Sequence, residues 1–280
     1  MSEPLTRLAE TREVPVVRIT SDATARQVDL AAVEEPLEVR LHDRPFAVIM
    51  RTPGADRALA AGFLLSEGVV AGPHELGAVE HCRHPRHPEV HNVVNVFLLG
   101  DARHRLDERL DGRRHVTANA ACGMCGRSTI ESLETRLPPL RLETRVSTTF
   151  VRGLPDGLRQ QQRIFDQTGG LHAAALFTAD GRLASSAEDV GRHNAVDKVV
   201  GAMLFGDALP LMGYVLVVSG RTSFEIVQKA WVAGIELVCA VSAPSSLAID
   251  TAEAAGITLI GFAREQGFNV YSHPDRMEQV

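Results

Sequence analysis

The feature that most constrains the fold is an alternation of strand-like and helical segments after Asp189. The strand-like segments read "YVLVVSG", "IELVCAVS" and "ITLIGFA", and the helical segments read "GRHNAVDKVVGAML", "SFEIVQKAWVAG" and "SSLAIDTAEAAG". Strands that are apolar at nearly every position must be buried on both faces, and intervening helices of about twelve residues suit the crossovers of a parallel sheet. This part of the chain therefore predicts an α/β fold with a parallel sheet covered on both sides.

The region before this alternation has a different pattern. The stretch "EEPLEVRLHDRPFAVIMRT" predicts strands at Leu37–Leu41 and Phe46–Arg51, "ADRALAAGFLLSEG" predicts a helix ending at Gly68, and "NVVNVFLL" predicts a strand. Further along, "GLRQQQRIFDQ" predicts one helix, and "HAAALFT" with "RLASSA" predicts a hairpin. We expect a mobile tail over 1–20, a smaller β-rich N-terminal subdomain over 21–116, and an α/β subdomain over 117–280.

Charge and cysteine content narrow the class of protein. The net charge is −6, and the basic residues are scattered and nearly all arginine, so no basic face for nucleic acid is evident. The N-terminus has no apolar signal region, and the longest apolar stretch is too short to cross a bilayer. We therefore expect a cytoplasmic protein that binds neither nucleic acid nor membrane. In a reducing compartment, a CxxC pair indicates a metal site or a reactive thiol.

Such a pair occurs in "AACGMCGRST", where Cys122 and Cys125 are each followed by glycine. A structural zinc site would need two further ligands, and a thioredoxin-like couple would follow a strand directly. A persulfide-carrying cysteine needs a mobile loop and a lowered thiol pKa, which the glycines and a following helix would provide. His87 and Glu89 upstream also suggest a zinc deaminase, although Ala121 replaces the proline of its P-C-x-x-C motif.

The loops after the three apolar strands are the second candidate site. They read "SGRTSF", "SAPSSL" and "AREQGFN", and they should share one rim because ligands of open α/β sheets bind beyond the carboxyl ends of the strands. Ser223 and Ser245 have the positions of helix N-caps, and Arg221 is a candidate phosphate ligand.

Two further features of the C-terminal half allow a structural or a functional interpretation. Asp189, His193 and Asp197 form a polar stripe at helical spacing, which fits a solvated helix face or a tuned acid/base group. Cys239, in an apolar run, is expected to be core packing.

Several segments together resemble a known family. These segments, which follow one another over roughly residues 34–273, are "EEPLEVRL", "MRTPGADRALAAGFLLSEGVV", "ACGMCG", "TGGLHAAALF", "EDVGRHNAVDKVVG", "SGRTSFEIVQKAWVAGI", "SAPSSLAIDTAEAAGITLIGFAR" and "FNVYSH". They are similar to the formate dehydrogenase accessory sulfurtransferases of the FdhD/NarQ family. The resemblance implies a cytidine-deaminase-like three-layer α/β/α core with a smaller β-rich N-terminal subdomain.

The resemblance also implies a sulfur carrier. Members of this family take persulfide sulfur from a cysteine desulfurase and deliver it to the molybdenum or tungsten bis(molybdopterin guanine dinucleotide) cofactor, a cargo needed for formate dehydrogenase activity. The implied persulfide site is Cys122, with Cys125 assisting, and no resident metal is implied. We also expect a homodimer. Two rival functions remain open: a zinc-dependent deaminase-like hydrolase and a non-catalytic molybdenum-cofactor chaperone.

The same resemblance places the cofactor contacts. The guanine-dinucleotide segment falls on Phe262, Ala263, Arg264, Glu265, Gln266 and Gly267, with Gly170, Asp189, His193 and Arg221 expected nearby. Family members often carry a basic residue at the position of Gly267, and we expect Arg264 or Arg221 to supply that charge here.

Overall fold

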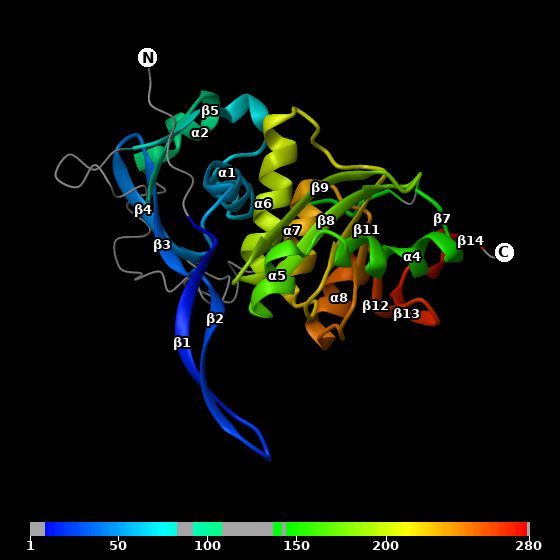
Figure 1. Cartoon of the computed structure of the whole chain (residues 1–280). Helices are drawn as coiled ribbons and strands as arrows, with labels where there is room; N and C mark the ends of the chain where they lie inside the picture. The colour runs from blue at the N-terminus through cyan, green and yellow to red at the C-terminus, as the bar shows by residue number, and fades with distance from the viewer. Residues whose placement is uncertain (1–8, 83–91, 108–136, 142–143, 279–280) are drawn as a thin grey trace.

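The computed structural model describes residues 9–82, 92–107, 137–141 and 144–278. Within these residues the fold is a mixed α/β arrangement with a four-stranded sheet, a six-stranded sheet and two small two-stranded pairings (Figure 1). The predicted boundary near residue 116 lies outside the described residues.

The four-stranded sheet has the order β4-β3-β6-β5. Its strands are β3 (Glu35–Leu41), β4 (Arg44–Arg51), β5 (Leu76–His81) and β6 (Val93–Leu98), with α1 (Asp56–Ser66) following β4. The three predicted strands (β3, β4 and β6) and the predicted helix are confirmed. Short elements accompany this sheet, namely a 3-10 turn at Pro73–Glu75 and α2 (Gly100–His104).

The six-stranded sheet has the order β13-β12-β11-β10-β8-β9. The strands are β8 (His172–Thr178), β9 (Leu183–Asp189), β10 (Tyr214–Val218), β11 (Leu237–Ala240), β12 (Thr258–Arg264) and β13 (Gly267–Ser272). β10, β11 and β12 are parallel, as predicted. The sheet as a whole is nevertheless mixed, because the predicted hairpin β8–β9 joins β10 in antiparallel fashion and β13 folds back on β12.

Helices cover both faces of this sheet, which makes three layers. Along β8, Ala173, Ala175 and Phe177 pack with α4 (Thr148–Arg159) on one face. Ala174 and Leu176 point to the opposite face because side chains alternate along a strand. There they meet the core built on α6 (Arg192–Phe205), α7 (Phe224–Ala233) and α8 (Ser246–Ala255). The α/β/α layering agrees with the expected architecture, whereas its deaminase-like topology stays a prediction.

The two sheets share one hydrophobic core through α1 and α6, which lie side by side in Figure 1. Two glycines allow the helix backbones to touch. A Cβ on Gly201 would lie 1.9 Å from the carbonyl oxygen of Ala58, and a Cβ on Gly62 would lie 2.0 Å from that of Asp197. These distances are far below van der Waals contact, so no side chain fits at either position.

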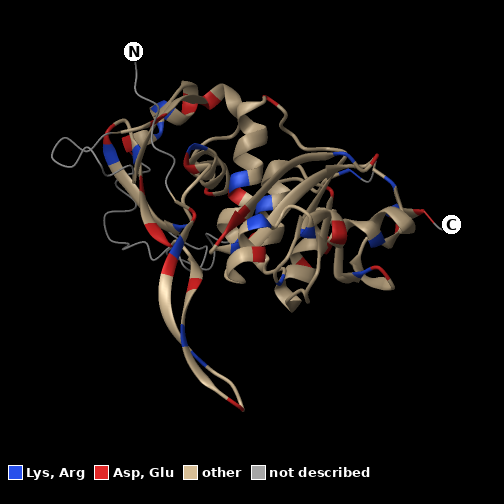
Figure 2. Ribbon diagram, viewed as in Figure 1, with Lys and Arg blue, Asp and Glu red and all other residues tan. Residues whose placement is uncertain are grey.

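The N-terminal segment differs from its prediction. Instead of a mobile tail, β1 (Thr11–Ile19) pairs along its whole length with β2 (Thr24–Ala32), and the far end of this ribbon extends away from the molecule (Figure 1). The ribbon carries charges of both signs along its length (Figure 2). Both of its faces are largely exposed, so the sequence lacks the polar–apolar alternation that marks a half-buried strand.

The helix predicted over 157–167 is in fact two, α4 and α5 (Arg163–Thr168). The break falls at Gln162, whose ψ of 57° is not helical. The Glu188 carboxylate of β9 accepts hydrogen bonds of 2.8 Å from the backbone N–H groups of Ile164 and Phe165, so a distant residue caps the start of α5.

The remaining elements are β7 (Val146–Ser147), a 3-10 turn at Pro274–Arg276 and β14 (Met277–Glu278). Among the described helices, none has the length and apolarity that a bilayer crossing requires.

Gly201→Ala should lower the free energy of unfolding by about 1–3 kcal/mol or more, because the methyl group must push α1 and α6 apart. Urea unfolding would measure this. Gly153→Ala is the matched control, since its Cβ would meet nothing within 4 Å on the exposed side of α4. That variant should be neutral or more stable by about 0.5–1 kcal/mol. Equal midpoints for Gly201→Ala and the parent would contradict the close crossing.

Candidate functional site

The loops that follow β10, β11 and β12 meet at one edge of the sheet, here called the rim. Thr222 and Pro244 form a bridge between the first two loops. Phe262 donates its N–H to the Ser242 carbonyl at 3.2 Å, and Arg264 Nη1 donates to the Val241 carbonyl at 2.6 Å. The prediction of a shared rim is therefore confirmed.

The third loop is shorter than its sequence suggests. Arg264 pairs with Gly267 across a tight hairpin, so only Glu265 and Gln266 form its turn. Phe262 lies at an irregularity in β12 with a φ of 52°, and its ring is 48% exposed. Ala263 is buried in the sheet core, which leaves Phe262 and Arg264 as the segment's outward-facing residues on β12.

A cavity of about 530 Å³ opens between the rim and the helices α4 and α5; we call it the rim cavity. Gly170, which precedes β8, and Arg264, at the end of β12, both line this cavity, whereas their predicted role as cofactor contacts stays a prediction. Its volume lies within the usual range for small-molecule sites. The lining residues come from α4, α5 and the rim: Pro155, Asp156, Leu158, Arg159, Gln162, Phe165, Gly169, Gly170, Leu171, His172, Ser219, Val241 and Arg264.

A smaller cavity of about 220 Å³, here called the α6 cavity, lies at the start of α6. Its lining residues are Glu34, Met50, His172, Val190, Gly191, Arg192, His193 and Asn194. His172 lines both cavities, so they adjoin at that imidazole. Burial and the charge of Arg192 lower the pKa of His172, which favours a neutral ring.

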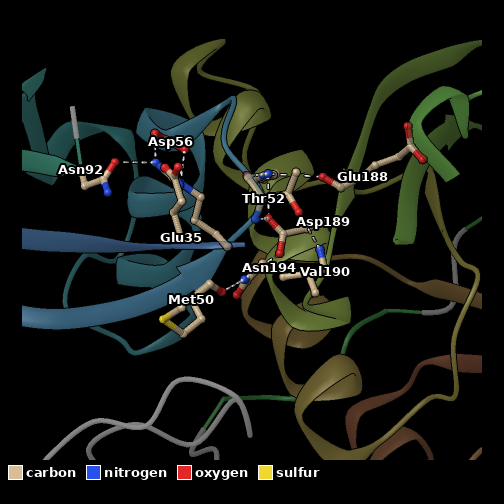
Figure 3. Close-up of polar contacts among 11 residues, drawn as sticks. Glu35, Met50, Thr52, Asp56, Asn92, Glu188, Asp189, Val190 and Asn194 are labelled. Carbon is tan, nitrogen blue, oxygen red and sulfur yellow. Dashed lines mark hydrogen bonds and ion pairs between the residues drawn. The ribbon is translucent and has the colours of Figure 1, made fainter. Parts of the chain in front are cut away.

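Asp189 is the last residue of β9, just before α6, and it is completely buried (Figure 3). Its carboxylate accepts hydrogen bonds from the backbone N–H groups of Thr52 and Gly191, at 3.2 and 2.8 Å, and from Asn194 Nδ2 at 2.8 Å. Lys198 Nζ lies 2.7 Å away and completes the set. Asp189 thus joins the end of β4 to the rim side of α6 and presents no free oxygen to either cavity.

His193 is 7% exposed and faces both the α6 cavity and α7. Its Nε2 lies 3.3 Å from Ser223 Oγ and 3.8 Å from Glu225 Oε2. Burial, together with the charges of Lys229 and Arg192, lowers the pKa of His193 to about 4, so the imidazole is neutral at pH 7.

The two predicted serine caps behave differently. Ser245 accepts a hydrogen bond from Ala248 N, which confirms it as the N-cap of α8. Ser223 has the N-cap position of α7, but its hydroxyl caps nothing and instead faces His193.

Asp197, the third residue of the polar stripe, is also buried, so the solvated-face interpretation of this helix is wrong. Lys229 Nζ of α7 lies 2.7 and 2.8 Å from the two carboxylate oxygens of Asp197, and Ser66 Oγ of α1 donates to the same group at 2.8 Å. Asp197 therefore connects three helices beneath the rim.

Other predicted residues have separate positions. Arg221 is exposed on the first rim loop and lines neither cavity. Cys239 is fully buried, and burial raises the pKa of its thiol to about 12, which confirms it as inert core packing. Cys122 and Cys125, like His87 and Glu89, lie outside the described residues. The described part of the chain contains no cluster of three or more metal-ligating side chains.

Sequence reasoning missed His172, Arg192 and the lining residues of α4 and α5. His172 stands two residues after the pair Gly169–Gly170, at the first position of a predicted strand, which is a signal for a site residue at a strand end. Nothing in the sequence indicated that α4 and α5 approach the rim, because that proximity depends on how the helices cover the sheet.

Comparisons with known proteins show the family to which the chain belongs and support its fold. The model of the FdhD/NarQ family matches residues 32–278. "Sulfur carrier protein FdhD" of Streptomyces coelicolor is 47% identical, over 97% of this chain and 96% of the relative. The protein of that name from Anaeromyxobacter dehalogenans strain 2CP-C is 49% identical, over 89% and 88%. A crystal structure from Desulfotalea psychrophila, described as a formate dehydrogenase accessory protein, shares the fold with a TM-score of 0.75. It is 24% identical and covers 96% of this chain and 100% of that one.

Lys229→Met should lower the free energy of unfolding by about 3–5 kcal/mol, because it leaves the Asp197 carboxylate buried without its cation. Adding Asp197→Leu should recover most of that loss, since an apolar pair of similar volume carries no desolvation penalty. Urea unfolding of the two single variants and the double variant gives the coupling free energy. Additive losses in the double variant would contradict a direct buried pair.

His193 should also make stability depend on pH. Its pKa is about 4 in the folded protein against an ordinary 6.5, so the unfolded chain binds more protons between these values. The free energy of unfolding should therefore fall as pH drops through this window, by at most about 1.4 kcal/mol per pH unit from this group. Urea midpoints at pH 7, 6 and 5 would show a smaller decline for His193→Asn than for the parent. Identical declines would contradict a buried neutral imidazole.

Proposed function

Because the chain belongs to the FdhD/NarQ family, we propose that it is a sulfur carrier for formate dehydrogenase. In this proposal a cysteine desulfurase is the donor, and the Mo or W bis(molybdopterin guanine dinucleotide) cofactor is the cargo that receives the sulfur. The protein acts as a cytoplasmic sulfurtransferase through a cysteine persulfide, and formate dehydrogenase receives the cofactor afterwards. We also propose a homodimer.

The proposed sulfur-carrying residue is Cys122. Its thiolate attacks the terminal sulfur of the donor's persulfide, the donor's S–S bond breaks, and the donor cysteine leaves as a thiolate. The terminal sulfur then bonds to the metal of the cargo, which supplies the two electrons that reduce this sulfur to sulfide, while the S–S bond on Cys122 breaks and Cys122 returns to the thiolate form. In this proposal Cys125 assists the transfer or resolves the persulfide. Cys82 and Cys239 are poor rivals, because burial raises the pKa of both thiols.

The observation that carries the cargo proposal is that Gly170 and Arg264 line the same rim cavity. Arg264 Nη1 is held by the carbonyl groups of Val241 and Ala263, so its guanidinium is pre-oriented at the cavity edge. Arginine in this position favours phosphate, which a dinucleotide cargo carries. Arg221 is exposed on the adjoining loop and is available for a second phosphate contact. It can thus supply the positive charge that Gly267 lacks.

Two other predicted cofactor residues receive more specific roles in this proposal. Asp189 is a positioning residue, because its buried carboxylate orients the start of α6 without touching a ligand. His193 lines the α6 cavity as a neutral imidazole, and through Ser223 it supports the loop that carries Arg221.

Incubation of the purified chain with a cysteine desulfurase and cysteine should add one sulfur atom, about 32 Da, to Cys122, as detected by peptide mass spectrometry. Cys122→Ser should abolish this addition, whereas Cys239→Ser should retain it because Cys239 is buried in the core. Absence of added sulfur on both Cys122 and Cys125 would overturn the carrier mechanism.

The same variants separate the rival functions. In cells that lack the native protein, Cys122→Ser should fail to restore formate dehydrogenase activity, whereas a non-catalytic chaperone would still restore it. Metal analysis of the purified protein tests the deaminase alternative. Stoichiometric zinc that disappears in Cys122→Ala would favour a hydrolase over the sulfur carrier.

A further inference from the structure

The rim cavity has two walls of different chemistry. The rim side contributes Arg264 and the polar groups of Ser219 and Gly170. The helical side contributes apolar surface from Leu158 and from Phe165 on α5, and it also contributes two polar side chains that the cofactor proposal does not use, Asp156 and Gln162. The helical side also carries Arg159, whose charge is balanced by Asp166. A ligand that fills this cavity therefore meets Arg264 at one end and an aromatic, hydrogen-bonding surface at the other.

Gln162 is the more unusual of the two polar residues, because it is only 6% exposed and yet lines the cavity. Its backbone groups are hydrogen-bonded, whereas its side-chain amide makes no hydrogen bond to any of the described residues and faces the cavity. This amide is thus available to a polar group that enters the cavity.

Asp156, which unlike Gln162 is exposed, presents its carboxylate at the same wall and has no ion pair among the described residues. Arg159, three positions along α4, does not neutralise it. The Arg159 guanidinium pairs with Asp166 and lies 5.1 Å over the Phe165 ring. Asp156 therefore offers two unused acceptor oxygens next to apolar and aromatic surface.

Among nucleobases, this combination matches guanine. The N1–H and N2–H₂ groups of guanine are adjacent donors that a carboxylate can accept as a pair, and its O6 and N7 accept from an amide such as that of Gln162. Adenine presents an acceptor at N1, which a carboxylate repels. Leu158, Leu171 and Phe165 supply the apolar and aromatic contact that a base requires.

We propose that Asp156 is the specificity-determining residue for the guanine base, with Gln162 as its partner. The base lies against α4 and α5, and the phosphates extend toward Arg264 at the rim. This inference rests on the proposed function, because it assumes that the cargo carries a guanine nucleotide. It goes further by assigning the base and phosphate ends of the rim cavity to named residues.

Calorimetric titration of the full-length protein with GDP, IDP, XDP and ADP tests the assignment. The parent should bind GDP at least tenfold more tightly than IDP, which lacks the N2 amino group, and should bind ADP more weakly still. Asp156→Asn should lose the preference for GDP over IDP and gain affinity for XDP, because an amide N–H can donate to the 2-oxo group of xanthine. Gln162→Ala should weaken GDP binding without creating a preference for XDP.

Asp250→Asn is the matched control, since it removes the same charge from an exposed position on α8 outside both cavities. It should leave the order of nucleotide affinities unchanged.

If the parent prefers GDP and Asp156→Asn keeps that preference without gaining affinity for XDP, the role of Asp156 is overturned while the proposed function stands. If the parent binds none of the four nucleotides, or does not discriminate among them, the guanine cargo itself is contradicted. The gain of XDP binding would not arise from a variant that merely fails to fold.

Discussion

The buried carboxylate of Asp189 is the interaction on which the arrangement of the site depends. It gathers hydrogen bonds from the end of β4, from the turn into α6 and from Asn194, and Lys198 balances its charge. Loss of such a carboxylate would leave Lys198 buried and unpaired, which is far more unfavourable than loss of a surface ion pair. The charge therefore specifies where the four-stranded sheet meets α6, and with it the position of the α6 cavity.

Lys198 reaches beyond Asp189 and links the two sheets at a second point. Its ammonium group also donates to the carbonyl groups of Thr52 and Glu188, at 2.9 and 3.2 Å. Glu188 in turn uses its side chain to cap α5, whose residues line the rim cavity. Neighbouring residues at the end of β9 thus support both cavities, one through α6 and the other through α5.

The glycine contacts between α1 and α6 complement this polar framework. Because Gly62 and Gly201 bring the two helix backbones into contact, α1 lies close enough for Ser66 to reach Asp197. The shared hydrophobic core supplies the bulk of the apolar burial, but apolar packing is not directional. Directionality comes from buried pairs such as Asp197–Lys229, which have only one arrangement in which their hydrogen bonds are satisfied.

The sequence by itself determined the strands and helices of the alternating C-terminal part and their common rim. Apolar runs such as "YVLVVSG" specify buried strands, and parallel strands joined by crossover helices must bring their following loops to one edge.

The tertiary structure alone decided which polar residues are buried and which helices line the cavities. Asp189, His193 and Asp197 look like a solvated stripe until the end of β4 covers the first and the helices α1 and α7 cover the other two. The break at Gln162 depends on Glu188, which is adjacent only after folding. Local patterns record the period of burial along one element, whereas the partner of a buried charge comes from a different element, and no local pattern can identify it.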